Sequence, residues 1–104
     1  MAFCFGDEKM LVWVIYDISG NKIRNNIAKF CKNCGLYRVQ KSAFLGEVNN
    51  SRIDELSLKC KEIIEETDSV YIFPIRNEDF KNIRLIGNKF DKKLVSGKLN
   101  IKFF

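Results

Sequence analysis

Seven consecutive apolar or aromatic residues, Met10 to Tyr16, run directly into the ionisable residue Asp17. The run is rich in Val, Ile and aromatic residues, and the turn-forming sequence Ser19-Gly20-Asn21 follows it closely. A run this short and this apolar predicts a strand that is buried on both faces. Such a strand fixes the position of its last residue, so the Asp17 carboxylate is expected at the edge of the sheet. The alternative is that Asp17 only marks the point where the core meets water.

Apolar periodicity predicts two amphipathic helices in the rest of the chain. The first covers residues 21–34, and Gly35 is its left-handed stop. The second helix follows the turn-forming pair Asn49-Asn50, and Ser51 with Asp54 three residues later is a capping-box-like start for it. The buried stripe expected on this second helix consists of Ile53, Leu56, Cys60, Ile63 and Ile64.

Three further segments favour extended structure. Residues 36–48 are rich in β-forming residues and make either one long strand or two strands joined by a break near Lys41-Ser42. Residues 69–76 predict another buried strand, in which Pro74 near the end favours an edge or terminal position in the sheet. A short strand is expected over residues 83–86, and the polar segment before it reads as a connection.

The order strand, helix, strand, helix, strand predicts an α+β fold of the ferredoxin-like split βαβ type, an antiparallel sheet with two helices on one face. Two helices cover only one face of such a sheet. Because the first strand is too apolar for its other face to remain wet, we expect a two-fold homodimer. Residues 1–9 are expected to form an N-terminal extension, 10–87 the domain, and 88–104 a basic tail that is a candidate for a strand exchanged with the partner.

Positive charge is concentrated in two blocks of this chain, whose formal net charge is +5. Residues 20–41 contain six basic residues and no acidic one, and residues 88–104 contain five lysines and one acid. Two basic blocks predict a polyanionic partner, either nucleic acid or the acidic face of another protein, unless the lysines serve solubility alone. No apolar run approaches the roughly 20 residues of a membrane helix, and the short acidic leader is no signal peptide, so we expect a cytoplasmic protein without a membrane partner.

Cys31 and Cys34 have the spacing of zinc ligands, but the chain has no histidine and no second pair of this kind. Both fall on the apolar face of the first predicted helix, while Cys4 and Cys60 lie in unrelated sequence contexts. We interpret the pair as small core residues of a protein from a reducing compartment.

Three motifs are more specific than the fold. They are a strand that ends in Tyr16-Asp17, an arginine seven residues later at Arg24, and a Gly-x-x-Arg-Val-Gln-x-Ser-x-Phe block that runs from Gly35 through Arg38 to Phe44. With them, the chain resembles CRISPR-associated protein two over about residues 10–87. Members of this family are the smaller of the two near-universal proteins of spacer acquisition.

The resemblance implies a homodimer that acts with the CRISPR integrase subunit when foreign DNA is inserted into a CRISPR array. It also implies a Mg²⁺-dependent phosphodiesterase activity on RNA or double-stranded DNA. The family's metal-binding aspartate falls on Asp17, its functional arginines on Arg24 and Arg38, and its aromatic site residues on Tyr16 and Phe44. Some members carry a further arginine two residues after the helical one, where this chain has Asn26.

The chemistry of these residues is compatible with that activity. Mg²⁺ commonly takes one or two carboxylates, keeps several waters and completes its shell with substrate phosphate. Two copies of Asp17 across a two-fold axis would form such a site, and the two arginines would neutralise the phosphate. Two alternatives stay open: a non-catalytic DNA-binding adaptor that bridges integrase subunits, and a toxin-like endoribonuclease of the related virulence-associated type.

Overall fold

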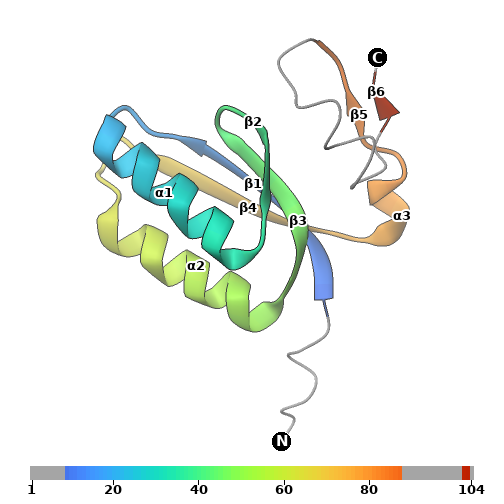
Figure 1. Ribbon diagram of the computed structural model, residues 1–104, viewed down its shortest axis with the longest axis horizontal. Coiled ribbons are helices and arrows are strands. Elements are labelled where there is room, and N and C mark those ends of the chain that lie inside the picture. The colour runs from blue at the N-terminus through green and yellow to red at the C-terminus, as the bar shows by residue number, and fades with distance from the viewer. Residues whose placement is uncertain (1–8, 88–101, 104) are drawn as a thin grey trace, which may run out of the picture.

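Strand β1 (Lys9–Asp17) lies inside a four-stranded antiparallel sheet. It pairs with β3 (Ala43–Asn49) along one side and with β4 (Ser69–Ile75) along the other. The strand order is β2-β3-β1-β4, so that β2 (Tyr37–Gln40) and β4 form the two edges (Figure 1). The edge position predicted for the Pro74 strand is confirmed.

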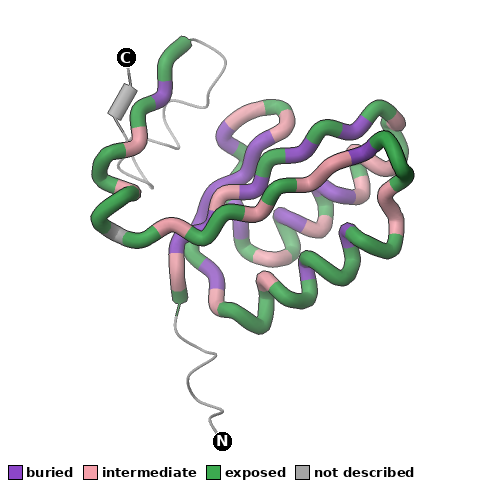
Figure 2. The backbone as a smooth tube through the Cα atoms, turned by 180° about the vertical axis from the view of Figure 1, so that it is seen from behind, coloured by how far each residue is buried: buried purple, intermediate pink, exposed green. Residues whose placement is uncertain are grey.

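Two helices cover one face of this sheet in the computed structural model, which describes residues 9–87 and 102–103. Helices α1 (Asn21–Cys34) and α2 (Asn50–Ile63) lie side by side (Figure 1). Each helix carries buried residues about once per turn, on the side that faces the sheet. Most of the α2 surface is exposed (Figure 2). The α+β sandwich expected from the sequence is therefore confirmed. None of the described helices has the length and hydropathy needed to span a membrane.

The main core lies between the helices and this face of the sheet. Its fully buried side chains are Val12, Val14, Ile27, Cys31 and Phe44. Helix α1 ends where the sequence predicts, because Gly35 adopts a φ of 102° and its N–H closes the last turn. Cys60 packs in the same core as Cys31, as expected from its place in the buried stripe predicted for the second helix.

Two strands, and not one, follow helix α1. Lys41 and Ser42 form the turn between β2 and β3, which decides the alternative that the sequence leaves open. The pairing of β2 with β3 shifts between Arg38 and Gln40. A shift of this kind is a β-bulge, which adds one residue to one strand. Arg38 and Phe44 remain directly opposite each other across the strands.

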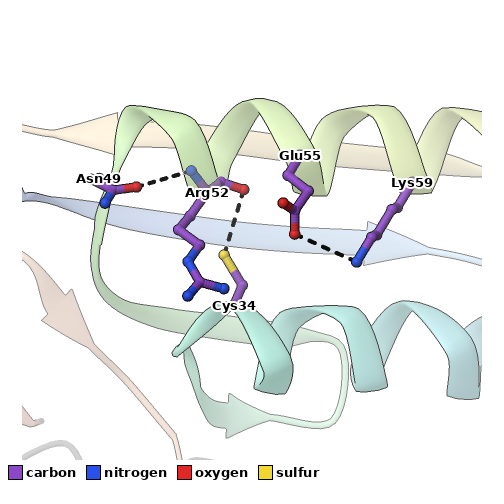
Figure 3. A network of polar contacts seen from close by, with 5 residues as sticks. All are labelled: Cys34, Asn49, Arg52, Glu55 and Lys59. Carbon is purple, nitrogen blue, oxygen red and sulfur yellow. Dashed lines mark hydrogen bonds and ion pairs between the residues drawn. The ribbon is translucent and has the colours of Figure 1, made fainter. Parts of the chain in front are cut away.

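Helix α2 (Asn50–Ile63) starts two residues earlier than a Ser51 cap would require. Asn49 ends β3 in an extended conformation, and its Oδ1 accepts a hydrogen bond of 3.0 Å from the backbone N–H of Arg52 (Figure 3). The capping box predicted from Ser51 and Asp54 is therefore wrong. The reason is that Asn49 is already positioned by the sheet and reaches the first free N–H groups of the helix.

The second face of the sheet is covered in part by the same chain. Helix α3 (Asn77–Phe80) and strand β5 (Arg84–Leu85) turn back from β4 and build a smaller cluster there. Its buried residues are Val39, Ala43, Leu45 and Leu85, and Trp13, Ile75, Phe80 and Ile83 pack against them. The expectation of an entirely uncovered second face is therefore wrong. Phe80, Ile83 and Leu85 cover part of this face with apolar side chains. Polar residues between them in the sequence hide this apolar pattern.

Strand β1 is not buried on both faces within one chain. Ile15 is 37% exposed, and its neighbours on β4, Tyr71 and Phe73, are 51% and 48% exposed. These side chains share one face, since Ile15 pairs with Tyr71 and Trp13 with Phe73. They form an exposed apolar patch on the half of the sheet that the α3–β5 segment leaves open.

Each of the two predicted terminal segments contributes residues to a described strand. Lys9, expected in the N-terminal extension, belongs to β1, and residues 1–8 lie outside the described residues. Strand β6 (Lys102–Phe103) pairs in parallel with β5 of the same chain. The rest of the predicted basic tail lies outside the described residues, and its exchange with a partner stays a prediction.

The capping assignment makes a first prediction. Asn49→Ala should lower the free energy of unfolding by about 1 kcal/mol, because it leaves the N–H of Arg52 without its acceptor. Ser51→Ala is the matched control and should change it by less than about 0.5 kcal/mol. Urea denaturation of both variants measures the difference. A larger loss of unfolding free energy in Ser51→Ala than in Asn49→Ala would show that Ser51 is the cap after all.

Candidate active site

Asp17 closes the central strand with an exposed carboxylate. Its backbone pairs with Ser69 of β4, which holds the end of β1 in place. No described residue donates a hydrogen bond to the carboxylate or forms an ion pair with it. The turn at Ser19-Gly20-Asn21, a possible structural partner, makes no such contact. The side chain is therefore available to a ligand.

The side chain of Arg24 holds the loop after Asp17 in place by hydrogen bonds. Its Nη1 donates a hydrogen bond of 3.1 Å to the carbonyl oxygen of Ile18, and its Nη2 donates to Oδ1 of Asn21. The guanidinium has five N–H donors, so these two bonds leave others for a phosphate. Sequence reasoning did not identify Asn21 as part of this site, although its position three residues before Arg24 on the helix places the two side chains together.

Tyr16, Phe44 and Arg38 form a second group on the helix-covered face. The rings of Tyr16 and Phe44 stack with centroids 6.3 Å apart, and Cζ of Arg38 lies 5.2 Å from the Phe44 centroid. Nη2 of Arg38 lies 3.4 Å from the Tyr16 hydroxyl oxygen, and that hydroxyl donates to the carbonyl oxygen of Lys41 at 3.3 Å. Both aromatic rings are buried, whereas Arg38 is exposed. The two rings therefore hold Arg38 and are themselves core residues.

The five residues predicted from the sequence thus do not form one cluster within a single chain. Consecutive residues of a strand point to opposite faces, so Asp17 and Tyr16 are neighbours in the chain but lie on opposite sides of the sheet. Arg38 and Phe44 join Tyr16, and Arg24 contacts the loop between the two faces.

The metal expected at Asp17 would be held by few protein groups. Among residues 9–87, no three His, Cys, Asp or Glu side chains are placed to hold a metal ion together. A single exposed carboxylate still fits Mg²⁺, because this ion commonly uses one or two carboxylates and takes its other ligands from water and phosphate. A site of this kind is meagre in one chain and becomes adequate when a second copy of Asp17 faces the first.

The thiols between the helices are not activated for nucleophilic chemistry. Burial raises the pKa of Cys31 to about 12 and that of Cys60 to about 11, and the nearby thiol of Cys34 adds to the shift in both. Burial also raises the pKa of Cys34 itself. The thiols of Cys31 and Cys60 therefore stay protonated at neutral pH and are poor nucleophiles. Cys31 and Cys60 are buried free cysteines, and Cys34 is a partly buried one that packs against the same core, as expected for core residues.

Comparison with known proteins identifies the family. Residues 10–83 match the family model described as CRISPR associated protein Cas2. The chain belongs to the Cas2 family. It is 34% identical over 83 residues to the CRISPR-associated endoribonuclease Cas2 of Korarchaeum cryptofilum, a match that covers 79% of this chain and 87% of that protein. A protein of the same name from Fusobacterium nucleatum is 35% identical over 95 residues, covering 86% and 89%.

Solved Cas2 structures have the same fold. A Cas2 crystal structure aligns with a TM-score of 0.67 and 30% identity over 79% of this chain and 91% of its own. Streptococcus pyogenes Cas2, crystallised at pH 6.5, aligns with a TM-score of 0.66 and 28% identity, covering 75% of this chain and all of the other. The ferredoxin-like fold and the family expected from the sequence motifs are confirmed. Nuclease activity is named for the curated relatives of this family.

The aromatic support of Arg38 makes a second prediction. Tyr16→Phe should lower the free energy of unfolding by about 1 kcal/mol, because the hydroxyl lost is buried and bonded at both ends. Tyr71→Phe is the matched control, since its side chain is half exposed and its hydroxyl has no partner among the described residues. Chemical denaturation compares the two, and an equal loss in both would contradict the role assigned to Tyr16.

Proposed function

We propose that this Cas2 protein is a Mg²⁺-dependent endonuclease that hydrolyses phosphodiester bonds of RNA or double-stranded DNA, and that it serves spacer acquisition in cytoplasmic CRISPR defence. The observation that carries the proposal is the unpaired, exposed carboxylate of Asp17 at the end of a strand that is paired on both sides. The names of the curated relatives support nuclease chemistry, and that of the Korarchaeum protein specifies an endoribonuclease.

The proposed active form is a two-fold homodimer. Asp17, Ile15 and Trp13 alternate along β1 and therefore point to the same face of the sheet. The exposed apolar patch with Tyr71 and Phe73 lies on this face as well. Association of two such patches about a two-fold axis would bury apolar surface and bring the two Asp17 carboxylates toward each other.

Each site residue has a distinct task in this proposal. Asp17 and its partner copy hold Mg²⁺, which when bound polarises a phosphate oxygen and lowers the pKa of a water that can attack phosphorus. Arg24 offers its remaining N–H donors to the phosphate at Asp17. The exposed guanidinium of Arg38, which is held on the helix-covered side of the sheet, contacts a neighbouring phosphate of the same nucleic acid. Tyr16 and Phe44 position Arg38. No histidine is present anywhere in the chain, so no imidazole takes part in proton transfer.

A second candidate function is a non-catalytic adaptor that holds duplex DNA between integrase subunits. The observation that favours it is the surface of α1, where Lys22, Lys29 and Lys32 are all exposed and no acidic residue accompanies them. A surface of this kind attracts a phosphate backbone without reading its sequence. In that function Asp17 would need no metal.

A third prediction separates these two functions. Asp17→Asn should lower Mg²⁺-dependent cleavage at least about 100-fold, since it removes the only protein ligand that each chain contributes. The same variant should keep its free energy of unfolding, because the carboxylate has no partner among the described residues.

The measurements are cleavage of labelled RNA and duplex DNA with Mg²⁺ or EDTA, Mg²⁺ binding by calorimetry, and thermal denaturation. Asp54→Asn, which removes an exposed carboxylate from α2, is the control and should cleave like the parent. Cleavage at the parental rate by Asp17→Asn would end the nuclease proposal. If the parent protein binds DNA but cleaves neither substrate, the adaptor function is the one that remains.

A fourth prediction concerns the homodimer. Phe73→Lys should convert a dimer into a monomer, because it places a charge in the centre of the exposed apolar patch. Leu58→Lys is the matched control, since Leu58 is 62% exposed on the outer side of α2. Light scattering gives the mass of each variant. A parent that is monomeric, or a Phe73→Lys variant that remains dimeric, would contradict the proposed assembly.

A further inference from the structure

A second polar surface lies at the opposite end of the sheet from Asp17. A groove of about 710 Å³ opens where β1 begins, α1 ends and α2 begins. The side chains that give it its chemical character are Lys9, Asn33, Tyr37, Glu47 and Arg52. Because Lys9 and Asp17 are the two ends of β1, the groove lies about 25 Å from the Asp17 carboxylate.

The side-chain charge of Arg52 in this groove has no charged partner among the residues that the structure describes. The two hydrogen bonds of this residue are made by its backbone, whose N–H donates to Asn49 and whose carbonyl accepts from the Cys34 thiol at 3.6 Å. The side chain extends from α2 past Cys34 at the end of α1 (Figure 3). Its guanidinium forms no hydrogen bond or ion pair with any residue in the described part of the chain.

The described residues that line the groove carry a net positive charge. Lys9 and Arg52 are cationic, and Glu47 is the one acidic residue among the described residues that line it. Lys32 of α1 is exposed one residue before Asn33 and adds to the positive potential. The nearby pair Lys59 and Glu55 is mutually neutralised at 3.5 Å (Figure 3). Cations without protein partners favour an anionic occupant.

We propose that this groove holds the phosphate backbone of the nucleic acid whose other contact is at Asp17. The inference rests on the proposed function for its ligand class, and it adds a binding site whose charged residues all lie outside the sequence motifs. At a rise of about 3.4 Å per nucleotide of duplex, the two contacts are about seven base pairs apart. Arg52 and Lys9 then contribute affinity and register, while Asp17 contributes the chemistry.

The test is a pair of charge changes with opposite expected effects. Arg52→Gln should weaken binding of a duplex of about 24 base pairs, measured by fluorescence anisotropy in EDTA. One lost phosphate contact reduces the slope of log affinity against log salt by about 0.9, which is about an eightfold loss of affinity at 0.1 M salt. Glu47→Gln should strengthen binding of the same duplex. Lys81→Gln, an exposed charge change on the α3–β5 segment, should leave affinity unchanged.

Folding and cleavage are measured on the same variants. Arg52→Gln keeps both backbone hydrogen bonds of Arg52, so its melting temperature should equal that of the parent. With Mg²⁺ its KM should rise while kcat stays at the parental value, since the groove is remote from Asp17. A parent that does not cleave, with affinities that still respond to Arg52 and Glu47, would end the nuclease proposal and keep this one. An unchanged salt slope and affinity in Arg52→Gln would overturn the groove proposal and leave an acidic protein as its occupant.

Discussion

The pairing of β1 with a strand on each side is the constraint on which the other features depend. Seven residue pairs join it to β3 and seven to β4, and Val12 and Val14 are completely buried beneath the helices. A strand held in this way cannot shift its register by one residue without moving its apolar set to the other face. The alternation of side chains is therefore fixed up to the last residue. It places Tyr16 in the core and Asp17 in water, although they are adjacent in the chain.

This arrangement divides the family's motif residues into those that support and those that face a ligand. Tyr16 and Phe44 are buried rings, and their physical effect is to hold the exposed guanidinium of Arg38 by a hydrogen bond and by a cation–π contact. Arg24 has both effects, because it fixes the loop after Asp17 and retains donors for a phosphate. Some residues of the family motif therefore serve the packing that positions the site, and only the others are free to contact a ligand.

Both faces of the sheet are apolar, and this small domain covers only part of the second one with its own chain. Helices α1 and α2 cover one face, and the short α3–β5 segment covers the β2–β3 half of the other. The exposed patch around Ile15, Tyr71 and Phe73 remains on the β1–β4 half. Because Asp17 lies on that same half, burial of the patch and completion of a two-carboxylate site would be one event. The proposed assembly and the proposed chemistry are therefore physically linked.

The sequence by itself determined the elements whose signals are local. The apolar run of β1, the periodicity of α1 and its stop at Gly35 depend on residues within a few positions of each other, and the motifs around Asp17 and Arg38 were sufficient to identify the family. Only the tertiary structure decided the rest. The cap at Asn49, the lid formed by α3 and β5, and the groove that unites Lys9 with Arg52 all depend on contacts between segments that the sequence separates. Such contacts follow from the packing of the whole core, which no local pattern specifies.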